Sequence, residues 1–141
     1  MQVTPPAPTI LAETVRRALS EDIDRGDVTT EACVAPTTIG AATLNAREPV
    51  VVCGLPIAEE VYAQLDLLVD VEMLVQDGSR AEAGAARATL SGPATSILLG
   101  ERVALNFMQR LTGVSTMTRR FVDALPAGSP TRITDTRKTT P

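Results

Sequence analysis

The C-terminal residues offer the side chains best suited to bind an anion. Asp-Thr-Arg-Lys-Thr-Thr-Pro (135–141) contains Lys138, the only lysine among 141 residues. A lysine ammonium is a compact point charge, whereas the neighbouring Arg137 is a planar fork of N–H donors. The hydroxyl groups around them, including that of Thr136, and a strand-like run before them (132–134) predict an anion site. A solvated surface loop is the alternative, because most charged residues are simply exposed.

A second set of polar side chains falls on one stripe of a helix predicted from about 95 to 112. Arg102, Asn106, Gln109 and Arg110 share this stripe, while the rest of the helix is mainly apolar. A helix that is apolar nearly all round is buried on most sides, so a polar stripe should face something specific. We expect Arg102 to be half-buried. Its stripe faces either a ligand site or water and an ion pair.

The elements that must position these residues are predicted from apolar periodicity and turn residues. Helical spacing occurs at 10–19 and 56–68, and strand patterns occur at 39–53, 71–75 and 84–90. Gly113 is placed to end or bend the next helix, after which a second helix continues to about residue 125. Strands and helices interleaved in this way predict an α+β domain.

The polar segment at 20–30 is predicted to be a loop. It carries four carboxylates within seven residues, at 21–27. The glutamate that an EF-hand requires at its twelfth position is missing, so we expect no calcium site.

The charge distribution favours a local anion site over a nucleic-acid surface. Residues 1–101 carry a net charge of −9 and residues 102–141 carry +5, which gives −4 for the chain. The three aromatic side chains are too few to stack on single-stranded nucleic acid. The chain has no histidine, so it lacks the usual neutral-pH acid or base and the commonest metal ligand. We therefore predict no metal ligands in it.

The cysteines and the N-terminus suggest a reducing compartment. Cys33 and Cys53 form no CxxC pair and have no histidine nearby, so we expect two small buried hydrophobic residues. The proline-rich start has no signal-peptide pattern, and no apolar run reaches the length of a membrane span. We expect a soluble cytoplasmic protein without membrane or nucleic-acid partners.

Three runs in chain order resemble the quinolinate phosphoribosyltransferases, also called nicotinate-nucleotide pyrophosphorylases (carboxylating). The runs are Glu21-Asp22…Gly26-Asp27-Val28-Thr29-Thr30, Glu101-Arg102-Val103-Ala104-Leu105-Asn106-Phe107…Leu111-Thr112-Gly113-Val114-Ser115-Thr116, and Asp135-Thr136-Arg137-Lys138-Thr139-Thr140-Pro141.

The resemblance implies an architecture in three parts. A disordered lead (1–9) would precede an open α/β sandwich domain (10–112). Residues 113–141 would form a connecting helix and the first strand of an incomplete, here truncated, α/β barrel. Members of the family are about twice this length, so we expect the chain to be an N-terminal fragment that is inactive alone.

The resemblance also implies a reaction and a site. Quinolinate and 5-phosphoribosyl-1-pyrophosphate would give nicotinate mononucleotide, pyrophosphate and CO₂ in de novo NAD biosynthesis, with Mg²⁺ bound to the pyrophosphate substrate. Arg102 and Arg137 match arginines that bind quinolinate, Lys138 matches a catalytic lysine at the junction of the two substrates, and Thr136 matches a contact in the same loop. The family is dimeric, so Arg102 would reach the partner subunit's site.

Other interpretations remain open to different degrees. A lipoyl- or biotinyl-type carrier needs a lysine at a hairpin tip, and residues 1–137 contain no lysine. A related phosphoribosyltransferase-like protein with another substrate, and a non-catalytic fragment, both remain possible.

Overall fold

The computed structural model describes residues 6–23, 26–136 and 138. The helices are α1 (Pro8–Ile23), α2 (Val28–Cys33), α3 (Leu55–Leu65) and α4 (Ala94–Asp123). The strands are β1 (Ile39–Asn45), β2 (Val50–Val51), β3 (Asp70–Met73), β4 (Arg80–Ala81) and β5 (Ala86–Pro93). The mixed α/β class that the sequence predicts is confirmed.

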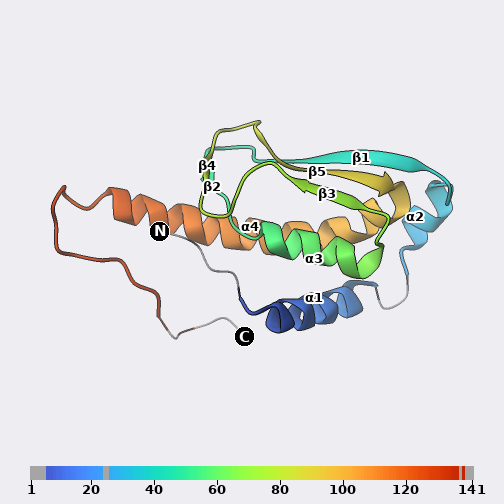
Figure 1. Cartoon of the computed structure of the whole chain (residues 1–141), viewed down its shortest axis with the longest axis horizontal. Coiled ribbons are helices and arrows are strands. Elements are labelled where there is room, and N and C mark those ends of the chain that lie inside the picture. Colours follow the sequence, from blue (N-terminus) through green and yellow to red (C-terminus); the bar gives the residue numbers. More distant parts are fainter. Residues whose placement is uncertain (1–5, 24–25, 137, 139–141) are drawn as a thin grey trace.

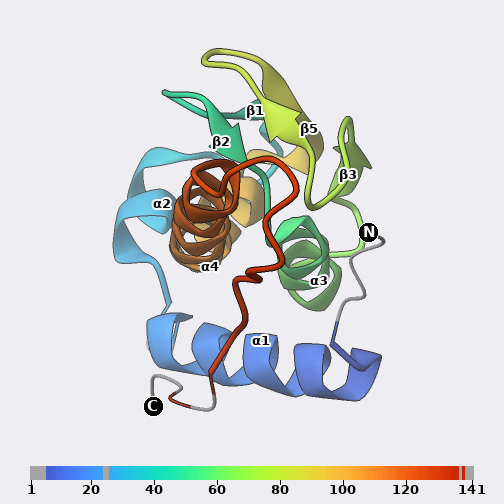
Figure 2. The same ribbon diagram turned by 90° about the vertical axis from the view of Figure 1, so that its left-hand side faces the viewer.

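A three-stranded antiparallel sheet forms one outer layer of the molecule. Its strand order is β1-β5-β3, and β2 pairs separately with β4. Exposed and partly buried residues alternate along β1, as expected for a strand with one covered face. Helices α3 and α4 lie beneath this sheet, and α1 lies below them (Figures 1 and 2). The opposite sheet face carries no helix in the described chain.

The core lies between the sheet and the helices. Each layer contributes fully or nearly fully buried apolar side chains, including Val15 of α1, Val61 of α3, Val103 of α4 and Leu90 of β5. Helices α3 and α4 approach closely at Gly100, where an added Cβ would lie 2.6 Å from Tyr62 Cε1. This packing fixes the first half of α4, which carries Arg102.

The N-terminal part is more helical than the sequence indicated. Helix α1 already begins at Pro8, inside the segment 1–9 that was expected to be disordered, and residues 1–5 lie outside the described chain. Proline suits a first helical turn, where its missing N–H has no partner to lose. The segment expected as a loop at 20–30 contains the end of α1 and the start of α2. Asp27 caps α2, because its Oδ1 accepts a hydrogen bond from Thr30 N at 3.1 Å.

Two C-terminal expectations were wrong. Gly113 does not end the helix, and the second helix expected after it is part of the same element, since α4 continues through it to Asp123; one interior glycine costs only about 1 kcal/mol relative to alanine. The strand expected at 132–134 is not formed, and residues 131–136 have no regular structure. A strand needs a neighbour for its backbone groups, and the described residues offer none here.

Candidate functional site

Arg102 lies on the outer side of α4 and is ion-paired. Its side chain is 59% exposed, more than the half-buried position expected. The Arg102 Nε donates a hydrogen bond to Asp22 Oδ2 at 3.2 Å, and Nη2 lies 3.2 Å from the same oxygen. Asp22 belongs to the last turn of α1, so packing of α1 against α4 brings together residues that are far apart in sequence.

The polar stripe of α4 faces outward. Asn106, Gln109 and Arg110 are exposed, like Arg102. The helix predicted at 95–112 was expected to be buried on most sides; it buries Ile97, Val103 and Met108 but exposes Leu98. Beyond that range, Met117 and other apolar residues of α4 are also exposed. The sheet and the helices α1, α2 and α3 all contact α4, yet both polar and apolar side chains of α4 remain exposed.

The predicted cation loop lies beyond α4. Residues 126–136 leave the end of α4 and run back towards the level of α1 (Figures 1 and 2). Thr136 and Lys138 are exposed, and the Lys138 backbone N–H donates to Thr136 Oγ1 at 3.2 Å. Arg137 lies outside the described residues.

The part of the chain that the structure describes shows no polar contact between the two parts of the predicted site. Among the described residues, neither a hydrogen bond nor an ion pair joins Thr136 or Lys138 to Arg102. Arg102 is fixed by a long helix and an ion pair. Lys138, by contrast, follows a segment without regular structure. The chain therefore presents one fixed cation and one loop cation.

The larger of two cavities is a groove of about 930 Å³ between the sheet and α4, and the described site residues Arg102, Thr136 and Lys138 do not line it. Arg87, which the sequence reasoning missed, contributes a side chain that is almost fully buried, because the residue is 3% exposed. Its Nη2 donates to Glu82 O at 2.7 Å and its Nη1 to Ala85 O. Its Nε has no partner among the described atoms.

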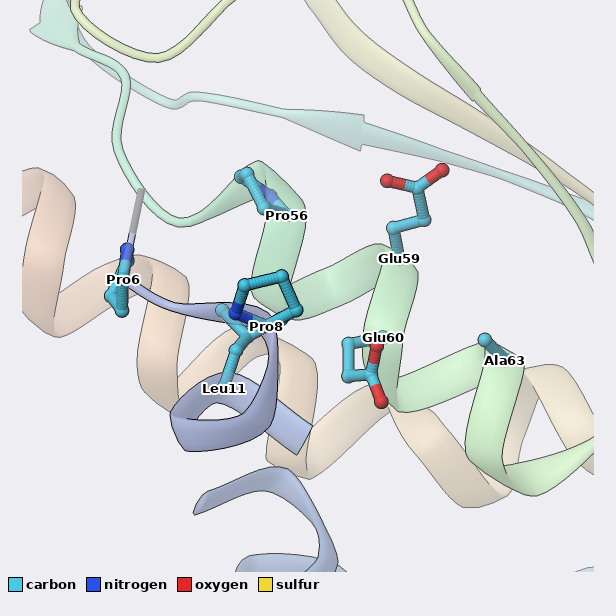
Figure 3. Close-up of a pocket in the computed structure, with 7 residues that line it drawn as sticks. All are labelled: Pro6, Pro8, Leu11, Pro56, Glu59, Glu60 and Ala63. Carbon is cyan, nitrogen blue, oxygen red and sulfur yellow. The ribbon is translucent and has the colours of Figure 1, made fainter. Parts of the chain in front are cut away.

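A smaller pocket lies between α1 and α3 (Figure 3). Its volume is about 350 Å³, and its lining consists of Pro6, Pro8, Leu11, Pro56, Glu59, Glu60 and Ala63. Two carboxylates and no cation line this pocket, so its charge is wrong for a dicarboxylate ligand.

The acidic segment beside Arg102 is the main feature that sequence reasoning missed. Hydrogen bonds from Thr30, and to a smaller extent the charge of Arg102, hold the pKa of Asp27 below its usual value. Asp22 and Asp27 belong to a run already noted for its resemblance, but sequence spacing gives no sign that they face a residue 80 positions later.

The described residues offer neither an evident metal site nor an activated thiol. They contain no group of three or more potential His, Cys, Asp or Glu ligands. Cys53 is partly buried, and burial together with nearby Asp77 raises the pKa of its thiol. Cys33 is exposed, contrary to the expectation that it is buried. No helix in the described part of the chain is long and apolar enough to cross a membrane.

The sequence matches the model of one known protein family over more than half of its length. The model of the quinolinate phosphoribosyl transferase N-terminal domain matches residues 27–112. A chloroplastic nicotinate-nucleotide pyrophosphorylase (carboxylating) from Oryza sativa subsp. japonica is 41% identical over 142 residues, 99% of this chain and 38% of that protein. A mitochondrial quinolinate phosphoribosyltransferase (decarboxylating) from Nicotiana tabacum is 39% identical over 144 residues, 100% of this chain and 40% of that protein.

The backbones of related solved structures are similar to that of this chain over nearly its whole length. A protein named NadC from Streptococcus pyogenes superposes with a TM-score of 0.91 at 34% identity, over 99% of this chain and 49% of that one. A nicotinate-nucleotide pyrophosphorylase from Ehrlichia chaffeensis gives 0.86 at 35% identity, over 100% of this chain and 49% of its own. The chain thus spans between about two fifths and one half of the length of these relatives.

Proposed function

Because this chain belongs to the quinolinate phosphoribosyltransferase family, we propose that it forms the N-terminal half of an enzyme of NAD biosynthesis. The complete protein means this chain joined to the half that its relatives have in addition. It transfers the phosphoribosyl group of 5-phosphoribosyl-1-pyrophosphate to the ring nitrogen of quinolinate. Pyrophosphate and CO₂ leave, and nicotinate mononucleotide remains. The relatives that match nearly all of this chain, and whose names state this activity, support the proposal.

The observation that carries the proposal furthest is the exposed guanidinium of Arg102. Quinolinate is a dicarboxylate, and a guanidinium binds a carboxylate through two parallel hydrogen bonds. Arg102 keeps donors accessible on a rigid helix, because its side chain is 59% exposed while Asp22 contacts only Nε and Nη2. We assign Arg102 to the binding of one substrate carboxylate.

The cation loop supplies the second part of the proposed site. Lys138 would lie where quinolinate meets the phosphoribosyl group, with Arg137 binding a carboxylate and Thr136 offering its hydroxyl or backbone. Charge develops on the departing pyrophosphate as the ribosyl carbon becomes cationic, and an ammonium group beside it stabilises that charge electrostatically. Such catalysis needs no histidine base in this part of the protein.

Magnesium belongs to the substrate in this proposal. The described residues offer no carboxylate cluster to hold a metal ion. We therefore propose that Mg²⁺ arrives bound to the phosphoribosyl pyrophosphate, and no step here depends on a metal ligand from this chain.

A homodimer completes the proposed site. Arg102 is exposed and has no described contact with Thr136 or Lys138 of its own chain. An outward-facing arginine of this kind suits a site shared with a second subunit. We propose a cytoplasmic enzyme, although some relatives are named as chloroplastic or mitochondrial.

Replacing Arg102 by alanine in the complete protein tests the assignment. The KM for quinolinate should rise between about tenfold and a hundredfold, since a hydrogen bond to a charged group contributes roughly 1.5–3 kcal/mol. The KM for phosphoribosyl pyrophosphate and the melting temperature should change little. Steady-state kinetics with detection of nicotinate mononucleotide measures both constants.

Arg110→Ala is the matched control, because Arg110 is also an exposed arginine on α4. It should leave both KM values unchanged. An unchanged quinolinate KM in Arg102→Ala, with a lowered melting temperature, would show that Arg102 serves folding and that this assignment is wrong.

A further inference from the structure

Arg102 is held by a less exposed acid from another helix. The Asp22 side chain is 26% exposed and that of Arg102 is 59% exposed. The carboxylate therefore lies on the inner side of the pair and the guanidinium on the outer side. Since Asp22 lies in α1 and α1 packs against both α3 and α4, the position of its carboxylate is set by the fold rather than by the arginine.

The contact occupies only one edge of the guanidinium. Arg102 Nε donates to Asp22 Oδ2, and Nη2 lies near the same oxygen. Among the described residues, no acceptor lies within hydrogen-bonding distance of Nη1. A guanidinium carries five N–H donors in one plane, so the edge formed by Nη1 and Nη2 remains available for a bidentate contact with a carboxylate.

A second acidic residue interacts electrostatically with the same arginine. Asp27, at the start of α2, is engaged mainly by Thr30 through hydrogen bonds of 2.7 and 3.1 Å. The charge of Arg102 adds to their lowering of the Asp27 pKa. The end of α1 and the start of α2 thus form an acidic border along one side of Arg102.

We propose that Asp22 is a positioning residue that holds Arg102 with its open edge directed outward, ready for a carboxylate of the pyridine dicarboxylate substrate. This inference rests on the proposed function. Arginine has one of the largest rotamer entropies of any side chain, and substrate binding to a free arginine would have to restrict it. Asp22 supplies that restriction before the substrate arrives.

Asp22 also has an electrostatic effect that opposes substrate binding, and we expect it to be weaker than the positioning effect. A carboxylate beside Arg102 reduces the positive field that attracts a dianion, so its removal could tighten binding. The pair is partly exposed, however, and solvent and salt screen charge interactions at such sites. Restriction of the arginine rotamers does not depend on that screening, so we expect loss of positioning to dominate.

The experiment compares Asp22→Ala and Asp22→Asn in the complete protein. Asp22→Ala should raise the KM for quinolinate about tenfold, which corresponds to loss of one modest interaction. Asp22→Asn should have a smaller effect, because its amide oxygen still accepts a hydrogen bond. For both variants, kcat and the KM for phosphoribosyl pyrophosphate should stay within about twofold of the unmodified protein.

Glu13→Gln is the matched control. Glu13 is on the same helix and forms an exposed ion pair with Arg16 at 2.7 Å, but it contacts no residue assigned to the site. It should leave every kinetic constant unchanged. The double variant Asp22→Ala/Arg102→Ala should be no worse than Arg102→Ala alone, since a positioning residue has no effect once its arginine is gone.

The outcomes separate this inference from the proposed function. If the unmodified protein forms no nicotinate mononucleotide, both are wrong. If Arg102→Ala weakens quinolinate binding but the Asp22 variants leave the KM unchanged or lower it, only the positioning role is wrong. Additive losses in the double variant would likewise overturn it. If Asp22→Ala does not fold, the KM of a folded Asp22→Asn, checked by its melting temperature, decides the question.

Discussion

Hydroxyl groups on α4 hold the extended segment that contains β2. Thr112 Oγ1 donates to Cys53 O at 3.0 Å and accepts from Cys53 N at 3.2 Å. Nearby, Ser115 Oγ donates to Val51 O at 2.6 Å, and Thr116 Oγ1 accepts from Val51 N at 2.9 Å. The second family-like run therefore has a structural task in this chain, besides carrying Arg102 in its first part.

Replacing Thr112 by valine should destabilise the fold by roughly 1–3 kcal/mol, because two partly buried backbone groups of Cys53 would lose their partner. Thr118→Val is the control: its hydroxyl is exposed and bonds only to Val114 O on its own helix, so it should change stability by less than about 0.5 kcal/mol. Urea unfolding measures both. Equal effects would contradict the bridging role of Thr112.

Tyr62 should make the fold sensitive to alkaline pH. It is the only tyrosine, and burial, with a smaller contribution from Glu101, raises its pKa to about 12. Its hydroxyl donates to Ile97 O at 3.2 Å. In the unfolded chain the phenol loses its proton near pH 10. Between these values the unfolded state binds fewer protons, so raising the pH favours unfolding.

The free energy of unfolding should therefore fall from about pH 10 to about pH 12, by at most about 3 kcal/mol for this one group. The stability that the protonated Tyr62 phenol contributes is fully present below pH 10 and is lost as the pH approaches the folded-state pKa. Tyr62→Phe has no phenol to titrate and should show a smaller fall. Unfolding curves across this range measure the difference, and identical pH profiles for the two proteins would contradict the shifted pKa.

At the level of elements, the spacing of apolar residues predicted most of the longer helices and strands. The helices that became α1 and α3, and the strands β1, β3 and β5, all fall within or close to the predicted segments. The short α2 was missed because a six-residue helix has too little periodicity to detect; its capping residue Asp27 was the available signal. The pairing partners of the strands follow from tertiary packing, which the sequence pattern does not contain.

Helix α4 continues through Gly113 although glycine has a low helix propensity. Gly100 and Gly113 are both inside this helix, yet sequence alone does not distinguish their roles. At Gly100 an added Cβ would lie 2.6 Å from Tyr62 Cε1 and 2.9 Å from Leu65 Cδ1, whereas at Gly113 it would meet nothing within 4 Å. Gly100 is required for the approach of α3, and Gly113 is not required by any described neighbour.

Alanine at these two glycines should have opposite effects. Gly100→Ala should destabilise the chain by roughly 1–3 kcal/mol, because the α3–α4 contact would be overpacked. Gly113→Ala should stabilise it by roughly 0.5–1 kcal/mol, the ordinary gain of alanine over glycine inside a helix. Thermal or urea unfolding of both variants provides the comparison. Stabilisation by Gly100→Ala would contradict the close approach of the two helices.

At the level of the whole molecule, the chain exposes a row of apolar residues on its longest helix. Val114, Met117 and Phe121 lie along the second half of α4 and are 59%, 51% and 59% exposed. Exposed patches of this kind usually mark a surface that another element covers. This chain covers 49% of each of two related solved chains, and the expectation that it is an N-terminal fragment stays a prediction. The proposed domain boundary at residue 112 remains a prediction.

The candidate site could be predicted only in part, because the sequence shows the types of its residues but not how the fold places them. The residue types of Arg102 and Lys138 indicated anion binding from sequence. Their mutual placement could not be predicted, because it depends on tertiary contacts, and the described residues make none between the two. The Asp22–Arg102 pair was also out of reach, since it joins two helices through the packing of the whole domain.

The measurement that tests the central claim most directly is the formation of nicotinate mononucleotide from quinolinate, phosphoribosyl pyrophosphate and Mg²⁺, followed by mass spectrometry. It is made with the complete protein and with residues 1–141 alone, each checked for intact mass. We predict product from the complete protein and none from residues 1–141, in whose described part no hydrogen bond or ion pair joins Arg102 to Lys138. Absence of product from the complete protein would contradict the proposed function. Turnover by residues 1–141 alone would contradict the claim that this half cannot form the site.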